Sequence, residues 1–157
     1  MQELLAACLN YLKQAEQYLK CDLTIPDIRL DLRGKAAGQA HLQRSQLRFN
    51  PVLYHENHEH FLIHTTAHEI AHWAVYQHYG HVRPHGKEWQ DLMANGFHLP
   101  ASRLHHYDIA TVSGPTFCYH CRCRTYQLSI RRHRAIQRGR QYQCRDCHQL
   151  LTPLHSS

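Results

Sequence analysis

The chain has 157 residues, 43% of them hydrophobic, and a formal net charge of +6. This length fits one compact domain with a small second unit. Its apolar runs fall short of the ~20 residues that cross a bilayer, and its first residues lack the pattern of a secretory signal. We therefore expect a cytoplasmic, monomeric protein with no membrane partner.

Charge and cysteines are unevenly distributed. Residues 109–157 contain eight arginines and one acidic residue, whereas residues 1–108 contain ten basic and eleven acidic residues. The chain has seven cysteines, most of them closely paired in the sequence. In a cytosolic protein such pairs favour metal binding over disulfides.

The N-terminal half predicts a helix, a small sheet and a second helix. Apolar residues recur at helical spacing over residues 2–21, which predicts a packing helix. Residues 28–50 alternate between apolar and polar side chains, so we predict three short antiparallel strands with one face packed on the next helix. Asn57 is a suitable N-cap for a long helix that ends near Tyr79.

This long helix carries the most informative motif. The sequence HEIAH at residues 68–72 matches the pattern HExxH. His68 and His72 lie one helical turn apart, so both imidazoles can bind one zinc ion. Glu69 is offset by about 100° and can reach water at the metal without being a ligand. This is the geometry of a general base in a metallopeptidase.

Three residues compete to be the third zinc ligand. His78 has the spacing of the metzincin pattern, but Val75 stands where that pattern needs a glycine, so the helix should continue and turn His78 away. His85 opens a second predicted helix over residues 86–95 and can swing back toward the metal, with Trp89 packed beneath it. Glu88 is the gluzincin-like alternative. We rank His85 first, Glu88 second and His78 third.

The C-terminal third contains a second set of metal ligands. Cys118 and Cys121 form one CxxC pair, and Cys144 and Cys147 form another after 22 intervening residues. This spacing is typical of a structural zinc ribbon, in which metal binding supplies much of the folding energy. Cys123 is the alternative to either member of the first pair.

Basic residues separate the two cysteine pairs. We predict that residues 127–132 and 141–143 form a hairpin whose arginines contact phosphate groups independently of sequence. The predicted nucleic-acid-binding residues are Arg131, Arg132, Arg134, Arg138 and Arg140. A solvated basic surface is the simpler alternative.

The motifs HEIAH and RPHGKEW, with LRFNPVLYHEN upstream and the cysteine-rich tail, resemble the SprT family of zinc metallopeptidases over roughly residues 25–152. The resemblance implies catalytic zinc on His68, His72 and His85, with Glu69 as acid/base. It also implies that a sheet edge pairs with the substrate, and a link to eukaryotic proteases that degrade proteins crosslinked to DNA. The chain departs from the family pattern in the tail, where Tyr126 replaces an expected histidine.

Together these observations predict an α+β, zincin-like metallopeptidase domain over residues 1–112 and a zinc ribbon over residues 113–157. The expected cofactors are one catalytic and one structural Zn²⁺ ion. We expect an endopeptidase acting on DNA-associated or DNA-crosslinked proteins. The alternative is a non-catalytic nucleic-acid-binding factor in which the HExxH metal is structural.

Overall fold

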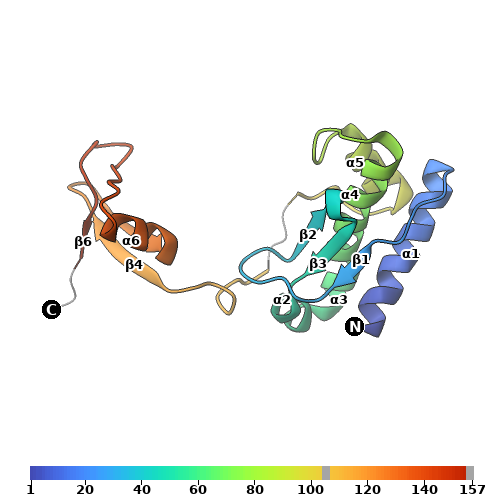
Figure 1. Cartoon of the computed structure of the whole chain (residues 1–157), viewed down its shortest axis with the longest axis horizontal. Helices are drawn as coiled ribbons and strands as arrows, with labels where there is room; N and C mark the ends of the chain where they lie inside the picture. The colour runs from blue at the N-terminus through green and yellow to red at the C-terminus, as the bar shows by residue number, and fades with distance from the viewer. Residues whose placement is uncertain (104–106, 155–157) are drawn as a thin grey trace. The chain divides into compact units, whose positions relative to one another are not determined.

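The computed structural model describes residues 1–103 and 107–154 and divides the chain into two compact units, Met1–Val112 and Ser113–Ser157 (Figure 1). The first unit begins with helix α1, Gln2–Leu19. Its buried residues recur every three or four positions and are Leu4, Cys8, Leu12 and Ala15. Within the described ranges, no helix is long and apolar enough to cross a membrane.

A small sheet follows, and its topology corrects the prediction of three antiparallel strands. The strands are β1 (Asp27–Arg29), β2 (Gly38–His41) and β3 (Gln46–Phe49), and a 3-10 turn, η1 (Leu42–Arg44), joins the last two. Their order is β1-β3-β2, with β2 antiparallel and β1 parallel to β3. Side chains alternate in both kinds of strand, so alternation cannot reveal direction. The order leaves β2 as an edge strand.

Asn50 caps the first helix after the sheet. Its side chain accepts hydrogen bonds from Val52 and Leu53 at the start of α2, Pro51–Glu56. Asn57 occupies the predicted N-cap position at the start of the next helical segment, but its side chain donates to the Leu53 carbonyl oxygen at 3.0 Å and makes no capping hydrogen bond.

The predicted long helix is divided into three helical segments. They are α3 (His58–His60), a π-helical turn, η2 (Phe61–Thr65), and α4 (Thr66–Tyr79). π-Helical turns often occur near functional sites, and this one lies directly before the HExxH motif.

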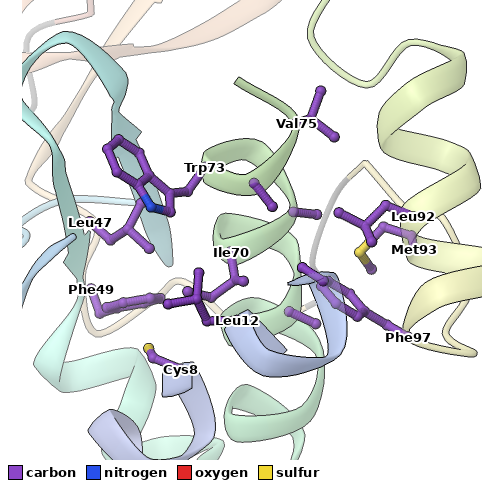
Figure 2. Close-up of a cluster of buried hydrophobic side chains, with 14 of the residues drawn as sticks. Cys8, Leu12, Leu47, Phe49, Ile70, Trp73, Val75, Leu92, Met93 and Phe97 are labelled. Carbon is purple, nitrogen blue, oxygen red and sulfur yellow. The ribbon is translucent and has the colours of Figure 1, made fainter. Parts of the chain in front are cut away.

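Helix α4 lies in the centre of the hydrophobic core, as its apolar composition predicts. Figure 2 shows Leu47 and Phe49 of the sheet on one side of α4 and Leu92 and Met93 on the other. The latter two belong to the π-helical turn η3 (Leu92–Gly96), which follows α5 (Lys87–Asp91). Burial on both sides fixes the orientation of α4 and therefore of the motif residues on it.

The described residues of the second unit form a small sheet and one helix. Strands β4 (Thr116–His120), β5 (Thr125–Ser129) and β6 (Thr152–Pro153) have the order β5-β4-β6, and every pairing is antiparallel. Helix α6 covers Ile130–Gln137. The predicted hairpin is therefore wrong, because β5 pairs with β4 and most of the arginines lie on or beside a helix.

Candidate metal centres and active site

Three imidazoles converge in the first unit. The Nε2 atoms of His68, His72 and His85 lie 3.0–3.2 Å from one another. Nitrogen ligands about 2.05 Å from a tetrahedral zinc ion are ~3.3 Å apart. The three donors therefore fit one zinc ion and leave its fourth position for water or substrate. Among the described residues, the cluster includes neither Glu88 nor His78.

The backbone around His85 explains how it reaches the helix. Gly80 ends α4 with φ 73°, a conformation that glycine adopts easily. His85 itself is left-handed, with φ 56°, and Gly86 closes the turn through its N–H to the Arg83 carbonyl oxygen. Left-handed backbone at a non-glycine residue is uncommon and clusters at functional sites.

Trp89 fixes the three imidazoles from below, and its predicted packing beneath His85 is confirmed. Its indole is buried and crosses the His85 ring edge-on at 4.7 Å. It also contacts the His68 ring at 4.8 Å and the His72 ring at 5.6 Å. One rigid aromatic side chain therefore limits the movement of every ligand in the cluster.

Burial keeps His72 in the protonation state that a metal needs. Loss of solvent, together with smaller contributions from the neighbouring His68 and His85, lowers the pKa of His72 to about 3. Burial also lowers the pKa of His85. Neutral imidazoles offer a lone pair to a cation, so the protein environment favours metal binding.

Glu69 lies beside the cluster, held between α4 and the edge strand β2. Its side chain is 6% exposed, and burial raises its pKa to about 8, while the backbone N–H of Ala40 opposes this shift. A carboxyl group with a raised pKa is suited to exchanging protons near neutral pH.

A cavity of about 820 Å³ opens next to Glu69 and His68. Tyr107 lines it and is held by contacts of its hydroxyl with Thr65 Oγ1 at 2.8 Å and His60 Nδ1 at 3.0 Å. A cavity of this size beside a buried carboxyl group can hold a side chain of a bound peptide.

The second cluster is made of cysteines, and it corrects one predicted ligand. The donor atoms of Cys121, Cys123, Cys144 and Cys147 all lie within 4.8 Å of one another. Thiolates at ~2.3 Å from a tetrahedral zinc ion would be ~3.8 Å apart, close to the 3.4 Å and 3.5 Å Sγ distances from Cys123 to Cys121 and Cys144. These four residues fit a structural zinc ion, with Cys123 in the place predicted for Cys118.

Cys118 is excluded by its place in a strand. It pairs with Gln127 across β4 and β5, and its sulfur accepts a hydrogen bond from the Gln127 side chain at 2.9 Å. Cys118 lies within β4, whereas Cys121 and Cys123 both follow the end of this strand, where the chain turns. The turn brings these two sulfurs together and leaves Cys118 outside the cluster.

Two contacts outside the ligand set support the cysteine cluster. The Tyr126 hydroxyl lies 2.9 Å from Cys144 Sγ. The backbone N–H of Cys147 and the Tyr126 hydroxyl lower the pKa of Cys144 to about 5, which favours its thiolate. An ion pair between Arg124 and Asp146 links the two cysteine-bearing turns.

The arginines singled out in the sequence lie on and just after α6. Within the described part of the chain, none of them forms an ion pair, and all are exposed: Arg131, Arg132, Arg134, Arg138 and Arg140. The opposite face of α6 is anchored by His133, whose ring stacks on Phe117 at 3.8 Å and whose Nδ1 lies 3.0 Å from the Tyr119 hydroxyl.

Comparison with known proteins identifies relatives of this chain. Residues 8–105 match the SprT-like family. A protein SprT from Vibrio parahaemolyticus is 47% identical over 138 residues, which cover 87% of this chain and 84% of the relative. Another from Actinobacillus succinogenes is 44% identical over 156 residues, covering 99% and 90%. No solved structure matches the chain. The family match and the similar relatives show that the chain belongs to the SprT-like family, and the histidine triad agrees with this assignment.

Proposed function

We propose that this protein is a zinc-dependent endopeptidase. The proposal rests on one observation above all: three imidazole nitrogens converge beside a buried carboxyl group at the mouth of a large cavity. Membership of a family considered to consist of metalloproteases supports it. A purely structural metal site would not require Glu69, which speaks against the non-catalytic alternative.

The protein's own residues divide the work of peptide hydrolysis. His68, His72 and His85 would hold a zinc ion, which when bound polarises the scissile carbonyl group and acidifies water. Glu69 accepts the proton of the attacking water and then donates it to the leaving amine. Strand β2 offers its free edge to an extended substrate backbone.

The substitution Glu69→Gln tests this mechanism. We expect two zinc ions per chain, as in the wild type, and a fall in kcat of at least ~100-fold, the contribution typical of general acid–base catalysis. Cleavage of a protein substrate and zinc content would be measured on the same preparation. Wild-type activity in this variant would remove Glu69 from the mechanism.

We further propose that the substrates are proteins associated with or crosslinked to DNA. The exposed arginines of α6 favour phosphate contacts that do not depend on base sequence. DNA binding would then raise the effective concentration of neighbouring protein at the active site.

Charge removal on α6 tests this second step. Arg131 and Arg134 lie on α6 and Arg138 directly follows it. Replacing all three with alanine should reduce the salt dependence of DNA affinity by about one unit of slope per lost phosphate contact. The matched control replaces three exposed cations of the first unit, Lys13, Arg33 and Arg44. Equal loss in both triple variants would indicate only a general effect of net charge.

A further inference from the structure

The position of the Glu69 side chain depends on an empty space at Gly38. A Cβ atom added to Gly38 would lie 2.6 Å from both Cγ and Oε1 of Glu69 and 2.8 Å from its Cδ. Real Cβ atoms essentially never approach other atoms so closely. Glu69 and Gly38 therefore occupy adjoining space in which a side chain at residue 38 has no room.

Backbone conformation does not explain the glycine. Gly38 lies in strand β2, and only Gly34, Gly80 and Gly139 have positive φ among the described glycines. The backbone of an extended strand accepts any L-residue except proline with little strain. What distinguishes residue 38 is the absence of a side chain.

The hydrogen-bond register shows which part of β2 Glu69 approaches. The Ala37 carbonyl oxygen accepts from the Asn50 N–H at 2.8 Å, and Gln39 and His41 are the next residues that exchange hydrogen bonds with β3. The peptide groups of Gly38 and Ala40 consequently face the free edge. The Ala40 N–H donates to Glu69, so the side chain lies against this edge.

We propose that Gly38 is a positioning residue: by having no side chain, it lets the Glu69 carboxyl group lie between α4 and the free edge of β2, beside the three imidazoles. This inference rests on the proposed peptidase function. Any larger residue would displace the carboxyl group while leaving the zinc ligands in place, because none of the three histidines is among the nearest contacts of the added Cβ.

The test is Gly38→Ala in the full-length zinc-loaded protein. We expect two zinc ions per chain, KM within about twofold of the wild type, and kcat reduced by ~10-fold or more, a part of the usual general-base contribution. The matched control is Gly114→Ala, since Gly114 has no atom within 4 Å of an added Cβ and no positive φ. It should retain wild-type kinetics.

A stability cycle tests the contact without using activity. Gly38→Ala should lower the unfolding temperature of the first unit by about 4 °C or more. In a Glu69→Ala background the overlap is gone, so the same substitution should cost much less. If Gly38→Ala fails to fold, recovery of folding in the double variant supports the contact, and failure to recover contradicts it.

The outcomes separate the two proposals. Absence of hydrolysis by the wild type would overturn the peptidase function. The stability cycle would still test whether residue 38 and Glu69 are in contact, because it does not depend on activity. An active wild type with an equally active Gly38→Ala variant would overturn the positioning role. A stability loss from Gly38→Ala that is equal in the wild-type and Glu69→Ala backgrounds would do the same.

Discussion

The two candidate ligand clusters differ in how much hydrophobic core surrounds them. The histidines of the first unit lie on or beside α4, whose two sides are packed against the sheet, α1 and η3. In the second unit, the buried hydrophobic residues among those described are only Tyr119, Cys121, Leu128 and Cys144, and two of these four are candidate metal ligands. We therefore expect the first unit to fold without metal and the second unit to depend on metal binding for its folding.

This difference matches the coordination that each cluster would give a metal ion. Three histidines would leave a fourth position free for chemistry. Four thiolates close the coordination sphere and supply the stability that a small core lacks.

Metal removal should therefore affect the folding of the two units differently. A strong chelator should unfold the second unit, because zinc contributes on the order of 10 kcal/mol to such small sites, and leave the first unit folded. Hydrogen exchange would show protection lost over residues 116–153 and retained in α1 and α4. Loss of protection in both units at the same chelator concentration would break the comparison.

Single substitutions of the ligands test the same difference between the two units. Cys144→Ser and His85→Ala should each reduce the zinc content from two ions per chain to one. Only Cys144→Ser should also remove exchange protection, and it should do so only in the second unit.

The hydrophobic core offers the second test. Phe49 is fully buried and packs edge-on against Phe61 at 6.0 Å between ring centres. Phe49→Ala should lower the free energy of unfolding of the first unit by about 3–5 kcal/mol, the usual cost of such a cavity. Denaturant unfolding followed separately in each unit would measure it. A comparable loss in the second unit would show that the two units share stability.

The sequence predicts the local parts of both sites. The i, i+4 spacing of His68 and His72 follows from helix geometry, and Trp89 is the large apolar residue one turn after His85. The helical core around Ile70 and Trp73 likewise follows from composition. In each case the neighbours in space are also neighbours in the chain.

The features that the sequence does not predict depend on contacts between residues far apart in the chain. The parallel pairing of β1 depends on β3, which lies beyond β2 in the chain. Helix α6 packs on the sheet through the stacking of His133 on Phe117, which lies sixteen positions earlier in the chain. The close approach of the Glu69 side chain to Gly38 has no signal in the neighbouring sequence. The exclusion of Cys118 depends on where β4 ends, a boundary that spacing alone does not mark.

The weakest expected effect concerns the support that each ligand set receives. Trp89 supports the histidines by packing, whereas the Tyr126 hydroxyl supports Cys144 by a polar contact at 2.9 Å. Tyr126→Phe keeps the ring and removes only the hydroxyl, so the second unit should still fold with zinc. Loss of such an outer contact typically reduces metal affinity by 10–100-fold, and we expect the lower end because Tyr126 is one of several donors around the cluster.

Competition with a chromophoric chelator would measure this affinity, with Tyr142→Phe as the control, since Tyr142 contacts Arg132 and is not among the donors to Cys144. Unchanged affinity in Tyr126→Phe would mean that four thiolates alone determine metal binding, which would sharpen the contrast with the packed histidine site.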